Sequence, residues 1–203
     1  MCMCLSITQH LLEEDEVLKT IISNVTLPDM ASTGQVFHDL MSCIIEQQIH
    51  YRSSKHTFTK LLQKAGLPLL TPDNFPELET KALQDVKLSS RKYETMVRIL
   101  EFFQQDVPDW QNLTDDEVRK ILGNIKGVGK WTIDMILLYT LERDNIFPVD
   151  DYHLKQLMVT LYQLDPKTKL AANMKTIAEH WSPYRSYGVK YLLAFKAYEK
   201  ERT

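Results

Sequence analysis

The stretch Ile121–Asp151 reads ILGNIKGVGKWTIDMILLYTLERDNIFPVDD, and this stretch decides the fold. Its glycine pair, in Gly127-Val128-Gly129, comes directly before an apolar segment with helical spacing. Two glycines one residue apart allow the backbone to turn tightly and to face its N–H groups outward. We therefore expect a helix, a tight glycine turn and a second helix, which covers about residues 131–141.

This turn has the features of a phosphate-binding site. The helix after Gly129 adds the partial positive charge of its dipole, and Lys130 can add a full charge at the same point. The residues Gly127, Val128, Gly129 and Lys130 are therefore candidate contacts to a nucleic-acid backbone. The alternative is a turn that joins two helices and has glycines only for steric reasons.

The rest of the chain also reads as helices joined by short turns. Apolar spacing predicts helices over residues 11–23, 39–65, 91–103, 115–123, 151–164, 169–180 and 187–200. Ser89 and Ser90 supply an N-cap for one of them, and Thr114 with Glu117 has the form of a capping box. Three prolines mark residues 67–77 as a connector. Because no long alternating pattern of strands is found, we expect an all-α fold.

The amino-acid composition indicates a globular protein that does not span a membrane. Apolar residues make up 44% of the 203 residues and charged residues 25%, which is an ordinary globular balance. No apolar run approaches the roughly 20 residues that cross a bilayer, and the N-terminus lacks a signal-peptide pattern. We therefore expect a protein inside the cell, with no membrane partner. A net charge of −3 counts against nucleic acid, unless backbone N–H groups hold the phosphates.

Cysteine content predicts neither a disulfide framework nor a metal centre. The chain has three cysteines, two of which are Cys2 and Cys4. A structural zinc site needs four ligands, and these two residues do not supply them. We expect no metal bound by side chains, and the sequence leaves the role of Cys2 and Cys4 open.

Five motifs, in order, resemble those of the helix-hairpin-helix (HhH-GPD) DNA glycosylase superfamily, most closely the branch of 3-methyladenine DNA glycosylase II. They are the hairpin itself and the residues 44–49, 88–92, 147–151 and 181–187. The resemblance covers about residues 39–198. It implies one glycosylase unit over 1–203 with two helical lobes, approximately 36–140 and 1–35 plus 141–203, and a base pocket in the cleft between them.

The same resemblance implies a role for the Asp150-Asp151 pair. Asp151 would face the base pocket as the catalytic carboxylate, while Asp150 would cap the helix that begins there. An ionised carboxylate near C1′ stabilises the positive charge that develops on the sugar when an N-glycosidic bond breaks. From the residues alone, both aspartates could instead be helix caps.

Trp131 bears on both the reaction and the pocket. Superfamily members that also cut the DNA backbone carry a lysine at this position, so the resemblance implies base removal by water and an abasic product. Trp131 and Met135 are four residues apart and share a helix face, which lines the base pocket in the resembled branch. An indole face attracts cations, which suits alkylated purines. Core packing is the alternative for both side chains.

Several further residues are candidates for DNA contacts. Gln48 resembles the wedge that fills the gap left by a flipped nucleotide, although it could be a polar helix end. Arg52, Arg91 and Lys92 are plausible phosphate contacts. As in relatives, carbonyl groups of the hairpin could hold a monovalent cation, and no other cofactor is expected.

These observations predict a monomeric, monofunctional DNA glycosylase of base excision repair that acts on double-stranded DNA. Its substrates would be alkylated purines of the 3-methyladenine and 7-methylguanine class. Two alternatives stay open: a glycosylase for deaminated, oxidised or mismatched bases, and a non-catalytic protein that uses the hairpin only to bind DNA.

Overall fold

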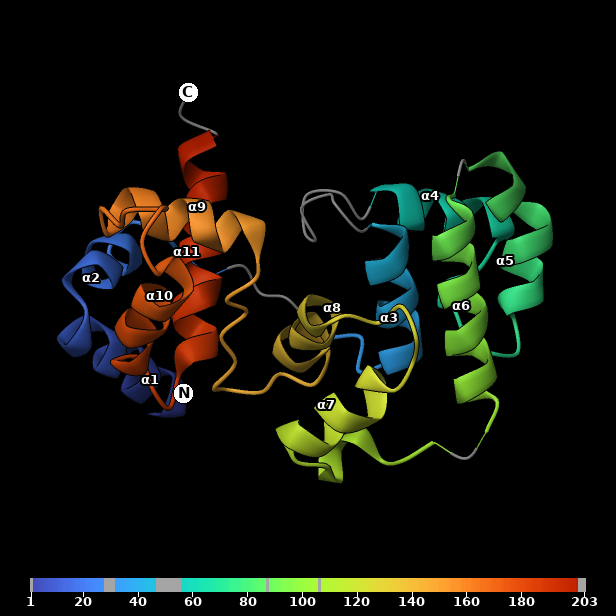
Figure 1. Ribbon diagram of the computed structural model, residues 1–203, viewed down its shortest axis with the longest axis horizontal. Helices are drawn as coiled ribbons and strands as arrows, with labels where there is room; N and C mark the ends of the chain where they lie inside the picture. The colour runs from blue at the N-terminus through green and yellow to red at the C-terminus, as the bar shows by residue number, and fades with distance from the viewer. Residues whose placement is uncertain (1, 28–31, 47–55, 87, 106, 201–203) are drawn as a thin grey trace. The chain divides into compact units, whose positions relative to one another are not determined.

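A computed structural model describes residues 2–27, 32–46, 56–86, 88–105 and 107–200 (Figure 1). Within these ranges every regular element is helical, so the prediction of an all-α fold is confirmed. Gln48 and Arg52 lie outside the described residues. None of the helices described is both long and apolar enough to cross a membrane.

The chain folds into two compact units. Unit 1 combines Met1–Ala31 with Arg143–Thr203, and unit 2 comprises Ser32–Glu142. The middle of the chain is therefore inserted between two terminal segments that fold together.

Unit 1 is built around its last helix. Its helices are α1 (Cys2–Glu14), α2 (Glu16–Ile22), α9 (Tyr152–Leu161), α10 (Leu170–Glu179) and α11 (Arg185–Lys200). The helix α11 packs against α2, α9 and α10, while α1 packs against α2 (Figure 1). The side chains at the centre of this unit are fully buried: Leu11, Leu18, Leu154, Met158, Trp181, Val189 and Leu192.

The helix predicted over residues 11–23 is in fact two helices. The break lies at Asp15, which has an extended backbone and caps α2 by accepting the N–H groups of Val17 and Leu18, both at 2.9 Å. The apolar spacing continues across the break, because Leu11 and Leu18 both face the core. Periodicity alone therefore did not reveal the cap.

Unit 2 packs its helices around α3. Its elements are α3 (Val36–Ile45), α4 (His56–Ala65), α5 (Phe75–Lys81), η1 (Leu83–Asp85), α6 (Ser90–Phe103), η2 (Trp110–Asn112), α7 (Asp115–Gly123), α8 (Lys130–Met135) and η3 (Ile136–Thr140). The helix α3 contacts α4, α6, α8 and η3, and α7 contacts α8. Figure 1 shows α3 and α6 side by side. All ten side chains of α3 are buried, so this helix forms the centre of the unit.

Two sequence-based boundaries in unit 2 were wrong. The helix predicted from Asp39 to Ala65 is interrupted, since α3 ends at Ile45 and Glu46 is no longer helical. The predicted connector over 67–77 ends early, because α5 begins at Phe75. Pro76 lies in the first turn of α5, where a helix has no use for the N–H that proline lacks. The three prolines alone therefore did not distinguish a connector from the start of a helix.

The predicted caps at the starts of two helices are confirmed. Ser89 caps α6, and Thr114 and Glu117 form a reciprocal capping box on α7. The backbone N–H of Thr114 donates to the Glu117 carboxylate at 2.8 Å, and this hydrogen bond lowers the pKa of Glu117.

Replacing the cap of α7 tests its contribution to stability. We expect Thr114→Ala to lower the free energy of unfolding by about 1 kcal/mol, because one N–H group of the first turn loses its acceptor. Urea titration followed by far-UV circular dichroism measures this loss. Thr114→Ser keeps the hydroxyl and should retain most of the stability. Equal losses in the two variants would contradict a role for the cap.

Candidate nucleic-acid interface and catalytic carboxylate

The predicted hairpin is present in unit 2, and Gly127 is the glycine that its geometry requires. Gly127 has a φ of +105°, and a Cβ built on it would lie 2.1 Å from Oγ1 of Thr95 on α6. Gly129 has a φ of −94° and open space around its missing side chain. The turn is therefore pressed against α6 at Gly127, while Gly129 begins the second helix at the surface.

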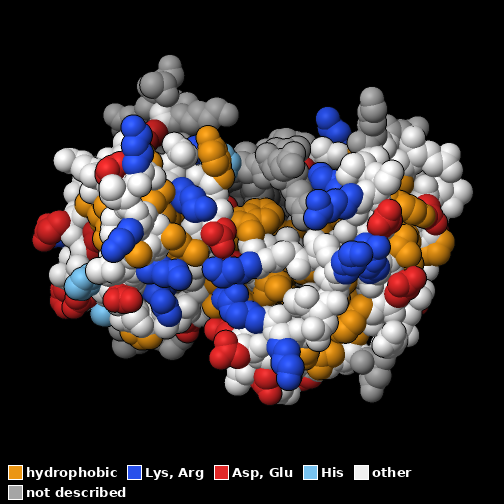
Figure 2. Space-filling view, in the orientation of Figure 1, with side chains coloured by type: hydrophobic (Ala, Val, Ile, Leu, Met, Phe, Trp, Pro, Cys, Tyr) orange, Lys and Arg blue, Asp and Glu red, His pale blue; other side chains and the backbone are white. Residues whose placement is uncertain are grey.

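The exposed surface of the turn is basic. Lys126, Gly127, Gly129 and Lys130 are exposed, whereas Val128 is buried and its N–H donates to the Ile125 carbonyl at 3.0 Å. Val128 thus belongs to the internal structure of the turn. Figure 2 shows Lys and Arg side chains on both units, interspersed with acidic and apolar ones, in keeping with the net charge of −3.

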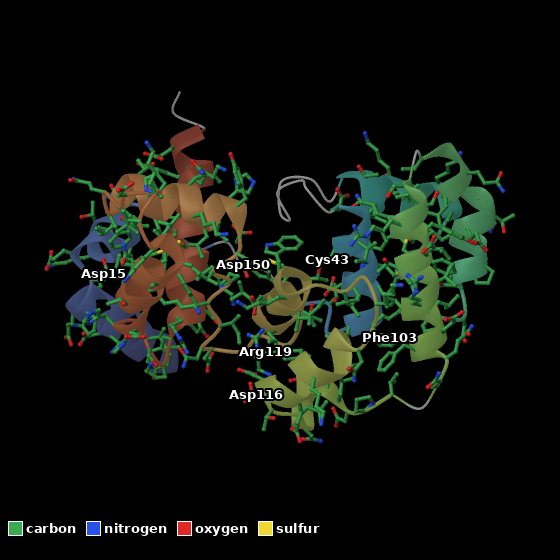
Figure 3. The ribbon with its side chains drawn as sticks, in the orientation of Figure 1. Asp15, Cys43, Phe103, Asp116, Arg119 and Asp150 are labelled. Atoms are coloured by element: carbon green, nitrogen blue, oxygen red, sulfur yellow. The ribbon has the colours of Figure 1, made fainter. Side chains whose placement is uncertain are left out.

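An ion pair between a half-buried arginine and a buried aspartate connects the two helices of the hairpin. Arg119 on α7 contacts the Asp134 carboxylate on α8 at 2.6 Å, and the Asp134 side chain is only 1% exposed. Arg119 is labelled in Figure 3. Removing Arg119 would take a counter-charge from this buried carboxylate, so we expect a loss of stability. Our sequence reasoning missed this pair, although an aspartate within the apolar segment 131–141 was a signal.

The second helix of the hairpin changes type along its length. It starts as α8 and continues as the π-helix η3, in which the Leu141 N–H donates to the Ile136 carbonyl at 2.9 Å. The extent predicted, 131–141, is close to that observed, but the wider turn was not predicted. Trp131 is half-buried and Met135 is 1% exposed. Both side chains therefore contribute to packing, Met135 almost completely.

The end of this helix is fixed by polar side chains of unit 2. Asp39 on α3 accepts hydrogen bonds from the hydroxyls of Thr33 at 2.6 Å and Thr140 at 2.8 Å. Ser32 donates to the Thr140 carbonyl at 2.6 Å. Hydrogen bonds to a charged acceptor are stronger than those between neutral groups. The π-helix that follows Met135 is therefore anchored to the start of α3.

Lys92 has a structural contact that our sequence reasoning did not predict. Its ammonium donates to the carbonyl of Ile45 at the end of α3, at 3.0 Å. Burial lowers the pKa of Lys92, and the negative charge of Glu46 partly offsets this. Arg91, its neighbour on α6, is exposed. The role of Arg91 as a phosphate contact stays a prediction.

In unit 1, Asp151 caps α9, and the prediction that Asp150 does so was wrong. Asp151 has an extended backbone, and its Oδ1 accepts the Leu154 N–H at 2.8 Å. Asp150, labelled in Figure 3, is exposed and lies 3.6 Å from the Lys155 ammonium. The helix begins one residue later than we assumed, which moves the cap to the second aspartate.

The Asp151 carboxylate is both buried and fixed in orientation. It is 7% exposed, and the N-terminus of α9 favours a negative charge at this position. Its own N–H donates to the Pro148 carbonyl at 2.9 Å, and the Val149 N–H donates to Phe147 at 2.9 Å. We call residues 147–151 the Asp151 loop. Hydrogen bonds within the loop and to α9 therefore hold this carboxylate in one place.

The start of this loop is attached to α11. The Ile146 N–H donates to the Ser186 hydroxyl at 2.9 Å, and the Ser186 N–H donates to the Asp144 carbonyl at 2.9 Å. Ser186 is fully buried. The segment before the Asp151 loop is thus held by the first turn of the last helix.

His153, two residues after Asp151, pairs with a lysine of α11. His153 on α9 contacts the ammonium of Lys196 on α11 through its Nδ1. An ammonium can only donate, so the ring must accept at Nδ1 and carry its proton on Nε2. Burial and the charge of Lys196 lower the pKa of His153, and the charge of Asp151 opposes them. The imidazole is therefore neutral near pH 7.

The candidate residues divide between the two units. Asp151 belongs to unit 1, while the hairpin, Trp131 and Met135 belong to unit 2. The proposed wedge, Gln48, lies outside the described residues. Among the described residues no cluster of three or more potential metal-ligating side chains is found.

A helix-hairpin-helix motif in an all-α chain, followed by a buried aspartate, is typical of a class of DNA repair proteins. Comparison with known proteins identifies the family to which this chain belongs. The chain belongs to the HhH-GPD superfamily of base excision DNA repair proteins, whose family model matches residues 41–183. It is 30% identical over 199 residues to the Bacillus subtilis protein named "Putative DNA-3-methyladenine glycosylase YfjP". That match covers 91% of this chain and 68% of the relative.

Solved structures show the same fold. The Schizosaccharomyces pombe 3-methyladenine DNA glycosylase, solved in complex with abasic DNA, has a TM-score of 0.73 and 23% identity. The match covers 92% of this chain and 94% of that one. A DNA-3-methyladenine glycosidase from Bacillus halodurans has a TM-score of 0.68, also with 23% identity, and covers 92% of this chain and 87% of its own.

The two glycines of the hairpin should respond differently to alanine. We expect Gly127→Ala to lower the free energy of unfolding by at least about 1–3 kcal/mol, because alanine is strained at a positive φ and its Cβ would collide with Thr95. Gly129→Ala should change it by no more than about 0.5 kcal/mol. Urea denaturation of both variants measures the difference, and equal losses would contradict the geometry described.

The lowered pKa of His153 predicts a pH dependence of stability. The unfolded chain, with its histidine pKa near 6.5, binds this proton more readily than the folded protein. Stability contributed by this ring is therefore present at higher pH and is lost as pH falls through 6.5. We expect the urea midpoint of His153→Gln to fall less than that of wild type between pH 7.5 and 5.5. Between pH 8.5 and 7.5 the two should change equally; a parallel fall across both windows would contradict the prediction.

Proposed function

We propose that this chain is a monofunctional DNA glycosylase of base excision repair. It hydrolyses the N-glycosidic bond of alkylated purines, of the 3-methyladenine and 7-methylguanine class, and leaves an abasic site. The single observation that carries the proposal is the buried Asp151 carboxylate, fixed at the N-terminus of α9 by the Leu154 N–H. Support also comes from the family and from the names of similar proteins.

Asp151 acts by electrostatics in this mechanism. As the bond between base and sugar breaks, positive charge builds up on the sugar at C1′. A fixed, desolvated carboxylate stabilises this charge without having to reorganise in the transition state. The same carboxylate orients the water that attacks C1′. The hydrogen bond to Leu154 uses Oδ1 and fixes the plane of the group for both tasks.

The chemistry of the lesion explains why the chain needs no strong general acid. A purine alkylated at a ring nitrogen is already cationic, so it departs as a neutral base without being protonated. Trp131 is half-buried on α8, and its indole face attracts such a cation more than it attracts a neutral purine. Met135, four residues on, is only 1% exposed, so it supports this part of the helix from within the core. In this proposal, selectivity for alkylated bases depends on the indole of Trp131.

Trp131 also defines the product. A backbone-cutting glycosylase forms a Schiff base through an amine, and the indole at this position has none. Water is therefore the nucleophile, and the strand stays intact at the abasic site. Lys130, one residue earlier, is exposed at the start of α8 and contacts phosphate instead.

The hairpin holds double-stranded DNA next to the lesion. Exposed backbone at Gly127 and Gly129, with Lys126 and Lys130, provides a small phosphate-binding surface that needs little net positive charge. Backbone carbonyls of this turn would hold a monovalent cation, as the resemblance to the family implies. The target nucleotide is flipped out of the duplex, and Gln48 fills the gap. The protein acts as a monomer where the cell keeps its DNA.

The products of the reaction test this function. We expect the purified protein to release free 3-methyladenine and 7-methylguanine from methylated duplex DNA, detected by chromatography. Gels should show strand breaks only after alkali treatment. Asp150→Asn is the matched control for Asp151→Asn, because Asp150 is exposed and does not cap α9. The Asp150→Asn protein should release base at nearly the wild-type rate.

Other results would overturn the proposal in distinct ways. Breaks without alkali would contradict the monofunctional assignment. Release of only deaminated or oxidised bases would contradict the substrate class. Binding without release of any base would indicate a non-catalytic DNA-binding protein.

A further inference from the structure

Asp15 is a buried carboxylate that the proposed mechanism does not use. It is 8% exposed and lies between α1 and α2, outside the residues that the family model matches (Figure 3). Its Oδ1 accepts the N–H groups of Val17 and Leu18, as described above. Its Oδ2 accepts the Tyr162 hydroxyl at 2.8 Å and the Trp181 indole N–H at 2.7 Å. A helix cap needs only Oδ1, so Oδ2 has a separate role.

The roles of donor and acceptor at Oδ2 are unambiguous. An indole N–H can only donate, so Asp15 must accept from Trp181. Burial and the negative charge of Asp15 raise the pKa of the Tyr162 hydroxyl, which therefore stays protonated and donates as well. Two donors therefore face each oxygen of Asp15, and a carboxylate, unlike an amide, accepts at both oxygens.

Trp181 connects Asp15 to the Asp151 loop. The indole is fully buried and meets the ring of Phe147 edge to face, with centroids 5.9 Å apart. Phe147 is the first residue of the loop, and its carbonyl accepts the Val149 N–H. A chain of direct contacts therefore runs from Asp15 through Trp181 and Phe147 to the segment that ends at Asp151.

Close packing against α11 and the hydrogen bond to Asp15 together determine the position of the indole. Gly188 of α11 also packs against the indole, so closely that a Cβ there would lie 2.7 Å from Cε3 of Trp181. The hydrogen bond to Oδ2 fixes the rotation of the ring between Gly188 and Phe147. Loss of this bond would leave the buried indole N–H without its acceptor, so the ring would have to shift.

We propose that Asp15 is a positioning residue for the reaction. It holds the Asp151 loop in position through its contact with Trp181 and the contact of Trp181 with Phe147. The inference rests on the proposed function, because it assumes that Asp151 acts on the sugar. It assigns a task to the N-terminal helices: they supply the acceptor that orients an aromatic ring behind the loop. Misplacing a reacting group by about 1 Å can cost on the order of 100-fold in rate.

The substitution Asp15→Asn separates the two oxygens. The amide oxygen can replace Oδ1 and keep the cap of α2, while the amide nitrogen then faces the indole N–H, so that two donors oppose each other. We expect the single-turnover rate of 7-methylguanine release to fall on the order of 10-fold or more, with Kd for duplex DNA containing an abasic-site analogue unchanged within about twofold. A rate within about twofold of wild type would overturn the proposal.

Tyr162→Phe is the matched control. It removes the other donor to the same oxygen and keeps the ring that lies beside Trp181. We expect the melting temperature to fall while the rate of base release stays within about twofold of wild type. If Tyr162→Phe lowered the rate as much as Asp15→Asn, Asp15 would have only a structural role.

Trp181→Phe tests the connection between the two residues. It removes the indole N–H and keeps an aromatic ring against Phe147. In the double variant Asp15→Asn with Trp181→Phe the opposed donors are gone, so its rate should be no lower than that of Asp15→Asn alone. Additive losses in this double-mutant cycle would contradict coupling through the indole. If Asp15→Asn does not fold, Trp181→Phe alone tests whether the hydrogen bond between the indole and Asp15 affects the rate of base release.

Hydrogen exchange gives a readout that does not depend on activity. The Asp151 N–H is bonded to Pro148 and reports the order of the loop. We expect its exchange to accelerate in Asp15→Asn and to stay unchanged in Tyr162→Phe. A wild-type protein that releases no base would overturn the proposed function alone, whereas unchanged exchange at Asp151 in Asp15→Asn would overturn the positioning role.

Discussion

The hydrogen bond from the Leu154 N–H to the Asp151 carboxylate is the constraint on which the proposed reaction depends. One contact does two things: it begins α9 and it fixes the plane of a buried, charged group. A helix N-terminus tolerates a buried carboxylate because its N–H groups and its dipole compensate for lost hydration. The position that stabilises the helix is thus also the position that holds the charge in the proposed reaction.

Each unit contributes one part of the proposed reaction and supports it by its own packing. In unit 2, Thr95 fills the space beside Gly127 and the Arg119–Asp134 pair joins α7 to α8, so the hairpin has a rigid base. In unit 1, the terminal segments of the chain fold together, which places Asp15 at the buried indole behind the Asp151 loop. The first helices are therefore part of the support for a residue more than a hundred positions later in the chain.

Features encoded by neighbouring residues could be predicted from the sequence. The capping box at Thr114, the N-cap at Ser89 and the glycine turn depend on spacings of a few residues, and the structure has all three. The break at Asp15 was hidden because apolar periodicity continues through it. The α5 helix was missed because proline stabilises a first turn as readily as it ends a helix.

Long-range contacts and exact helix boundaries could not be predicted. Asp150 and Asp151 are equivalent as caps until the first helical residue is known, and an error of one residue assigned the cap to Asp150 instead of Asp151. The pairing of Arg119 with Asp134 and that of Asp15 with Trp181 arise only when distant segments pack. The π-turn in η3 has no local signal that we recognise. Gln48 and Arg52, which lie outside the described residues, stay predictions.

The most direct test of the central claim compares chemistry and binding in Asp151→Asn. Asparagine keeps an oxygen that can cap α9, so the fold should persist while the negative charge is lost. The account predicts that the single-turnover rate of 7-methylguanine release falls on the order of 100-fold or more, while Kd for duplex DNA with an abasic-site analogue changes by less than about threefold. Equal losses of release and binding, or release at the wild-type rate, would contradict a catalytic role for Asp151.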